Sequence, residues 1–325
     1  MQYARRLTAR SSAWLGSLLM AVFIAGCGGG GGDNSASNSQ PTDTTPPNPL
    51  LAEAGAPQQT GVMATDGFNW FNFRRQQMGL APVSRSSLID KAAQAHSAYQ
   101  ALNDMITHDE VRTRRGFTGA TLFDRLIAAQ YPLGQTNIAY GEVISATGDT
   151  SGANAAEDLI TAIYHRFVIF EPKFLEAGAG TASATSGYTY FTTDFATRTL
   201  SQGGLGSGRL VTYPVANQQN LPTVFFSDQE QPDPVPDRNE VGYPVSVHAD
   251  ITSTIEIQTF TISPRGGAPL ATRMLTHDND TEIGEPSTAA IIPLAVLQPQ
   301  SFYDVQFIGR VDGVPVNLFW SFKTR

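Results

Sequence analysis

The chain has 325 residues, of which 41% are hydrophobic and 15% are charged. A chain of this length and composition can build two domains, each with its own core. Its 21 basic and 29 acidic side chains give a net charge of −8. No basic run or patch could neutralise a row of phosphates, so we expect no nucleic acid partner.

The first 26 residues have the pattern of an export signal. Three arginines precede an apolar stretch over residues 13–24, and small residues then lead to Cys27, the only cysteine of the chain. The apolar stretch is too short to span a membrane. The segment resembles a bacterial lipoprotein signal, which implies cleavage before Cys27 and acyl chains attached to it. An ordinary signal peptide with an unrelated cysteine is the alternative.

The compartment follows from this resemblance. Lipoproteins of this kind are held in the cell envelope by their N-terminal acyl chains, so a membrane is the first expected partner. Residue 28 is Gly rather than Asp, which favours the outer membrane. The prediction is therefore an exported protein, lipid-anchored in the bacterial cell envelope.

Composition divides the remaining chain into four parts. Residues 27–59 are rich in Gly, Ser, Thr and Pro and predict a flexible tether. A first folded domain is expected over residues 60–198. Residues 199–208 have the composition of a linker, and residues 209–325 predict a second domain.

The first domain shows helical patterns followed by a strand pair, which predicts an α+β fold. Residues 87–106 carry the longest pattern, with an apolar face expected at Leu88, Ala92, Ala95, Tyr99, Leu102 and Ile106. The other helices are expected at 66–78, 121–129 and 154–165, and the aromatic hairpin ends near residue 195.

The second domain consists of short β-rich runs between Pro, Gly and Asp clusters, with no helical window. This pattern predicts an all-β sandwich of the immunoglobulin or fibronectin type III style. Such domains mostly serve as spacers or binding modules, and no chemistry is expected in it.

Two of the five histidines are candidate site residues. His108 and His165 each fall at the expected end of a helix that leans on the same sheet. Two imidazoles brought together would form half of a divalent metal site, completed by carboxylate or water. Two unrelated histidines are the alternative. His96 lies one residue off the expected apolar face and is assigned a hydrogen-bonded packing role.

A series of short motifs in fixed order resembles the CAP superfamily, which comprises cysteine-rich secretory proteins, antigen 5 and pathogenesis-related proteins and is also called the SCP domain. The resemblance covers roughly residues 66–196. The matching segments are Asn72 to Pro82, Ala92 to Ser97, Thr107-His108, Asp124 to Leu126, Asn137 to Gly141, His165-Arg166, Glu171 to Phe174 and Gly178 to Gly180.

This resemblance implies an α-β-α sandwich with a cleft of two histidines and two glutamates, which binds Zn or another divalent ion in some members. The chain departs from that pattern in two places. Thr136 stands where the first glutamate is expected, and no carboxylate lies between Asp158 and His165. Glu142, six residues after Thr136, is a substitute, although we expect it in the strand or turn beyond. Any Zn or other divalent ion would then be held weakly.

The resulting hypothesis is a lipid-anchored envelope protein whose two-histidine cleft binds an apolar ligand, such as a lipid or sterol, or an envelope ligand. An envelope protein or polysaccharide is a further expected partner. One alternative is a divalent-metal-dependent peptidase or esterase using the same cleft, although the missing carboxylates argue against an enzyme. The other is a structural envelope protein with a vestigial cleft.

Overall fold

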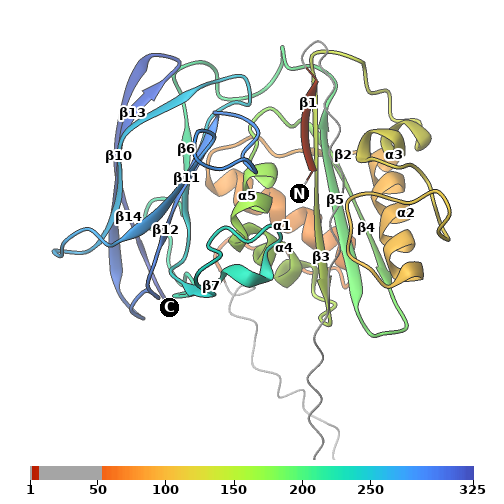
Figure 1. Ribbon diagram of the computed structural model, residues 1–325, viewed down its shortest axis with the longest axis horizontal. Coiled ribbons are helices and arrows are strands. Elements are labelled where there is room, and N and C mark those ends of the chain that lie inside the picture. Colours follow the sequence, from red (N-terminus) through yellow and green to blue (C-terminus); the bar gives the residue numbers. More distant parts are fainter. Residues whose placement is uncertain (1, 7–52) are drawn as a thin grey trace, which may run out of the picture.

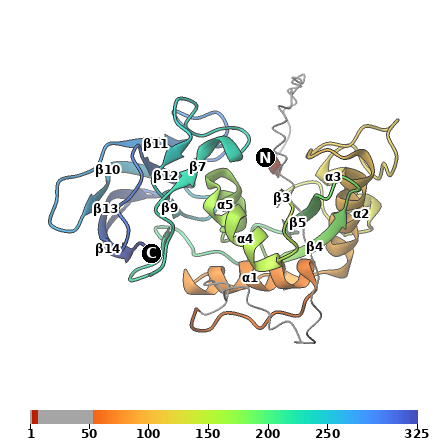
Figure 2. The same ribbon diagram turned by 90° about the horizontal axis from the view of Figure 1, so that it is seen from below.

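The computed structural model describes residues 2–6 and 53–325. Its layers run across Figure 1 from two helices, through a five-stranded sheet and three further helices, to the β-sheets of the C-terminal domain. Helices α2 and α3 cover one face of the five-stranded sheet, and α1, α4 and α5 lie on the other face (Figures 1 and 2). The fold is therefore α+β, with the second group of helices placed between the central sheet and the C-terminal sheets.

The N-terminal domain contains all five α-helices of the described residues. Their bounds are Met63–Gln77 for α1, Ser87–Asn103 for α2, Leu122–Ala128 for α3, Gly152–Thr161 for α4 and Ile163–Ile169 for α5. The strands of the central sheet are Gln2–Arg6 (β1), Ser84–Arg85 (β2), Ile138–Thr147 (β3), Glu176–Ser183 (β4) and Thr189–Thr197 (β5).

The strand order is β1-β3-β5-β4-β2, and every pairing is antiparallel except that of β2 with β4. Helix α2 packs closely on β4, because Gly178 and Gly180 have no Cβ atoms. A Cβ atom at either position would collide with the α2 backbone. The Gly-x-Gly motif is thus a packing requirement of this layer.

Helix ends differ from the sequence-based expectation in two places. Helix α2 ends at Asn103, because Asp104 adopts a left-handed conformation with φ of 48°, so His108 lies in the loop beyond. The helix expected over 154–165 is two helices, because Ala162 has extended backbone angles. His165 therefore lies in the first turn of α5 and not at the C-terminal end of a helix.

The buried face of α2 is also rotated from the expected one. Leu88, Leu102 and Ile106 are 36%, 48% and 58% exposed. The residues that α2 buries are Ile89, Ala92, Ala93, His96, Ser97, Tyr99 and Gln100. The polar members of this face are buried because they hydrogen bond to the sheet and to the following loop.

The C-terminal domain has two larger antiparallel sheets, ordered β10-β13-β14 and β11-β12-β9-β6, and the small pair β7-β8. Their bounds are Val211–Tyr213 (β6), Phe225–Phe226 (β7), Glu240–Val241 (β8), Val245–His248 (β9), Ile255–Pro264 (β10), Thr272–Thr276 (β11), Thr288–Pro293 (β12), Phe302–Val311 (β13) and Val314–Lys323 (β14). A short 3₁₀ helix, η1, spans Ser227–Gln229. The β-rich character of this domain is confirmed.

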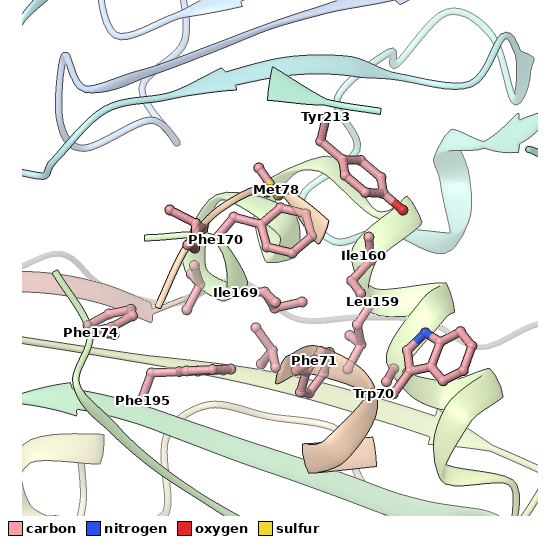
Figure 3. Packing of buried hydrophobic residues seen from close by; sticks show 14 of the residues in the cluster. Trp70, Phe71, Met78, Leu159, Ile160, Ile169, Phe170, Phe174, Phe195 and Tyr213 are labelled. Atoms are coloured by element: carbon pink, nitrogen blue, oxygen red, sulfur yellow. The ribbon is translucent and has the colours of Figure 1, made fainter. Parts of the chain in front are cut away.

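The two domains share one hydrophobic core. Figure 3 shows Phe170 beside Tyr213 of β6, and their ring centroids lie 5.0 Å apart. Phe71 of α1 and Leu159 of α4 belong to the same buried cluster. Arg166 of α5 extends this contact, because its guanidinium lies 4.9 Å from the ring of Tyr213 and 5.1 Å from that of Tyr243. The C-terminal domain is therefore docked on the helices, which a pure spacer would not require.

The expected linker is held in place as well. Asp250 accepts hydrogen bonds from the backbone amides of Leu205 (2.6 Å) and Gly206 (2.9 Å), and Lys173 donates to the carbonyl of Gly203 (2.9 Å). The export signal beyond residue 6, Cys27 and most of the expected tether lie outside the described residues. Within the described ranges, no helix is long and apolar enough to cross a membrane.

Candidate functional site

His108 lies in the loop after α2 and is held by a carboxylate from the sheet. Its Nδ1 atom is 2.8 Å from Oε1 of Glu142, a fully buried residue of β3. Arg125 of α3 donates to Oε2 of Glu142 (2.6 Å) and to the carbonyl of His108 (2.8 Å). The three residues form a closed unit, in which one guanidinium fixes both the imidazole and its carboxylate.

The charges of this unit follow from burial and pairing. Burial alone would raise the pKa of Glu142, but Arg125, His96 and His108 outweigh it and hold that pKa below its usual range. Burial lowers the pKa of His108, against the opposing effect of Glu142. His108 is therefore neutral near pH 7, with the proton on Nδ1 facing the carboxylate and a lone pair on Nε2.

A second buried pair supports the loop that carries His108. His96 Nδ1 lies 2.9 Å from Oε1 of Glu110, and His96 Nε2 lies 2.7 Å from the carbonyl of Thr107. Glu110 also accepts hydrogen bonds from Thr118 and Gly119. His96 thus has a structural role and ties helix α2 to the residues on both sides of His108.

His165 is held in the same manner, by a glutamate from the other domain. Its Nδ1 atom is 2.9 Å from Oε1 of Glu230, which is 1% exposed and follows η1. The Glu230 carboxylate also accepts hydrogen bonds from the amides of Ile163 (2.7 Å) and Tyr164 (2.7 Å). An anionic group at the N-terminus of α5 satisfies amides that have no partner within the helix.

Sequence reasoning missed Glu230. The residue lies 65 positions after His165, in a proline-rich segment where the sequence predicts no chemistry. No local pattern signals that this segment folds back onto the N-terminus of α5. Only the docking of the two domains makes the contact.

Of the site residues expected from the sequence, the structure brings only some together. Each histidine has its own glutamate partner, Glu142 for His108 and Glu230 for His165, and among the described residues no hydrogen bond joins the two histidines. Glu142 stands beside His108. Thr136 is exposed in the bend before β3, and among the described residues no hydrogen bond joins it to either histidine. Cys27 lies outside the described part of the chain.

A groove of about 740 Å³ runs between the two domains beside His165. The N-terminal domain contributes Ile106, Leu159 and His165, and the C-terminal domain contributes residues that include Val224, Phe225 and Glu230. The groove also follows the end of β3, from Ile144 to Thr147, and the next residue, Gly148. Its volume lies in the range of small-molecule sites.

Three apolar side chains at this groove are exposed. Ile106 is 58% exposed, Tyr188 is 52% exposed and Phe226 is 38% exposed. Apolar groups that gather around a concave surface indicate a binding site more strongly than scattered ones do. The arrangement offers a ligand exposed apolar side chains together with polar groups, which include Asp158, His165, Glu230 and Arg325.

The residues present do not complete a divalent metal site. In the described ranges, no group of three or more His, Cys, Asp or Glu side chains is placed to hold an ion. Both carboxylates are already engaged, Glu142 by Arg125 and Glu230 by helix amides. Each histidine has only Nε2 left, and two imidazole nitrogens fall short of the three or four protein ligands of ordinary zinc sites.

Comparison with protein-family models matches residues 68–195 to the Cysteine-rich secretory protein family, CAP. These residues form a CAP domain. His108, Glu142 and His165 lie inside the matched range, and Glu230 lies outside it. The Asn72 to Gly180 motif series therefore identified the family correctly.

Solved structures resemble part of the chain. An extracellular protein with an SCP domain from Bacillus anthracis str. Ames is 22% identical, with a TM-score of 0.33, over 41% of this chain and 39% of that one. An outer surface protein from Borrelia burgdorferi is 15% identical, with a TM-score of 0.35, over 43% of this chain and 96% of that one. The chain thus spans well under half of the first of these proteins. No curated protein sequence matches it significantly.

Proposed function

We propose that this protein is a binding protein of the bacterial cell envelope, whose CAP domain and C-terminal domain together hold an apolar ligand. The groove between the domains is the observation that supports this function. A lipid or sterol-like molecule would pack on the apolar residues of its lining, and His165 would offer it one directional polar contact. An envelope protein or polysaccharide is the alternative ligand.

The export signal supports the proposed location. Acyl chains on Cys27 would hold the protein at the outer membrane, and residues 27–59 would tether the folded part. Incorporation of labelled fatty acid into the chain, and its loss in Cys27→Ser, would test this anchor. Labelling that persists without Cys27 would contradict it.

Ligand binding is best tested with the chain from residue 28 onward, which keeps every described element except β1. Fluorescent fatty acid and sterol probes should bind saturably, and Phe226→Asp should weaken binding by about tenfold or more. Phe319→Asp is the matched control, because Phe319 is 71% exposed on β14 and does not line the groove. Absence of saturable binding, or equal effects of both variants, would contradict the proposal.

A metal-dependent peptidase or esterase is the second candidate, and one observation favours it. Both histidines turn Nδ1 to a carboxylate and keep Nε2 available, as metal-binding histidines usually do. Among the described residues, no third ligand stands with the two histidines. Metal content after purification without chelators, compared between the wild type and His108→Ala, would test this candidate. If His108→Ala and His165→Ala both retain every property of the wild type, a structural role with a vestigial cleft is favoured instead.

A further inference from the structure

We propose that Glu230 is a positioning residue that fixes the tautomer of His165, so that the groove presents a hydrogen-bond acceptor to its ligand. The ligand class that follows is an apolar molecule with a donating head group, such as an alcohol, in preference to a carboxylate. This ligand class rests on the proposed function, whereas the role of Glu230 does not.

The contacts of Glu230 determine which ring nitrogen carries the proton. Oε1 accepts hydrogen bonds from the amides of Tyr164 (2.7 Å) and His165 (3.2 Å), and Oε2 accepts one from the amide of Ile163 (2.7 Å). A carboxylate surrounded by backbone donors can only accept, so the fourth contact, at 2.9 Å, needs a proton on Nδ1 of His165. Whenever the imidazole is neutral, its lone pair is then on Nε2.

The same contacts fix the direction of the ring. Glu230 is 1% exposed and His165 is 8% exposed, so both side chains are packed and have little freedom to rotate. Both residues also line the groove. With Nδ1 turned to the glutamate, Nε2 is the remaining polar atom of the ring that a ligand can contact.

A hydrogen-bond acceptor at Nε2 of His165 would favour a ligand head group that can donate a proton. A hydroxyl group donates to an imidazole lone pair, whereas an ionised carboxylate has no proton to donate. Arg325 also lines the groove and would favour a carboxylate instead. Comparison of an alcohol with the acid of equal chain length therefore decides which of the two residues sets the selectivity.

The position of Glu230 gives the C-terminal domain a defined role. The matched family region ends at residue 195, so the CAP domain alone lacks the group that orients its second histidine. The departure noted in the sequence, no carboxylate between Asp158 and His165, is thus compensated from outside the domain.

The tautomer can be measured without any ligand, by nuclear magnetic resonance of isotope-labelled histidine in the chain from residue 28 onward. Near neutral pH, we expect His165 to carry its proton on Nδ1. Glu230→Gln should lower the population of this tautomer, and Glu230→Ala should shift His165 towards the Nε2-protonated form. Glu240→Ala is the matched control, an exposed glutamate of β8. A wild-type His165 protonated on Nε2, or no change in either Glu230 variant, would overturn the positioning role.

The ligand class is tested with dodecanol and dodecanoate, each below its aggregation limit. We expect the alcohol to bind about tenfold more tightly, the size of one directional hydrogen bond, and the ratio to approach one in Glu230→Gln. Equal or tighter binding of dodecanoate to the wild type would overturn the ligand class. Failure of both probes to bind, while His165 shows the expected tautomer, would overturn the proposed function and the ligand class and would support the positioning role alone.

Discussion

Glu142 on β3 and Asp194 on β5 are direct partners across the central sheet, and both are fully buried. Burial and the negative charge of Glu142 raise the pKa of Asp194 well above its usual value. Glu142 keeps its charge because Arg125 and two histidines surround it. The pair therefore holds one proton near neutral pH, and this proton belongs to Asp194.

Replacement of Asp194 by Asn should stabilise the protein near neutral pH. In the unfolded chain Asp194 ionises at about pH 4, whereas the folded state keeps it protonated, so folding is penalised at every pH above that value. Asn keeps the shape and has no proton to lose. We expect the free energy of unfolding to rise by about 1–3 kcal/mol near pH 7, and the gain to vanish below about pH 4. Urea unfolding at several pH values measures it.

The control for this variant is Asp237→Asn, because Asp237 has a side chain that is 72% exposed. This change should leave stability within about 0.5 kcal/mol of the wild type. If Asp194→Asn destabilises the protein at all pH values, the assigned protonation state is wrong.

Removal of Arg125 should destabilise the protein strongly. Arg125→Met leaves the Glu142 carboxylate buried without its guanidinium, and an uncompensated buried charge costs about 3–5 kcal/mol. Arg85→Met is the matched control. Its partner Asp90 lies 3.0 Å away, but both side chains are partly exposed, so the loss should stay within about 1 kcal/mol. Equal losses in the two variants would contradict the buried unit.

Arg166 should determine whether the two domains unfold together. Its guanidinium donates to the carbonyls of Ile160 (2.6 Å) and Pro244 (2.7 Å), one in each domain. Arg166→Met should lower the free energy of unfolding by about 3 kcal/mol or more and separate one thermal transition into two. Calorimetry measures both effects. Arg198→Met serves as the control, because this arginine is 53% exposed; a single transition in both variants would argue against the coupling.

Acid should weaken the fold through a histidine outside the groove. Burial and the charges of Arg166 and Arg75 lower the pKa of His248 well below its usual value. Below about pH 6.5, His248 binds a proton in the unfolded chain but not in the folded state. The free energy of unfolding therefore falls as the pH falls, by up to about 1.4 kcal/mol per pH unit. His248→Gln should flatten this slope in urea unfolding between pH 7 and pH 5. An unchanged slope would contradict the assignment.

Much of the fold was predictable because its signals are local. The capping box at Thr121 and Asp124, the α-helical periods and the β-rich C-terminal runs each depend on residues close in sequence. The family was also predictable, because its motifs follow one another in fixed order. The predicted buried face of α2 was rotated by about one residue from the observed face. The reason is that His96, Ser97 and Gln100 are buried with hydrogen bonds, which a hydrophobic pattern does not show.

The site was predictable only in part. The sequence singled out His108 and His165 as chemistry-bearing residues, and it named Glu142 as a substitute carboxylate. It could not show that Glu142 faces His108, because the loop after α2 and the strand β3 meet only in the folded sheet.

The sequence by itself determined the α+β domain, the CAP motif series and the candidate histidines, because helix periods, turns and ordered motifs depend only on residues that are close in sequence. The tertiary structure alone decided that the C-terminal domain docks on α5, forms one wall of the groove and delivers Glu230 to His165. The physical reason is that a contact across 65 residues is set by which surfaces bury each other, and no local pattern records that choice.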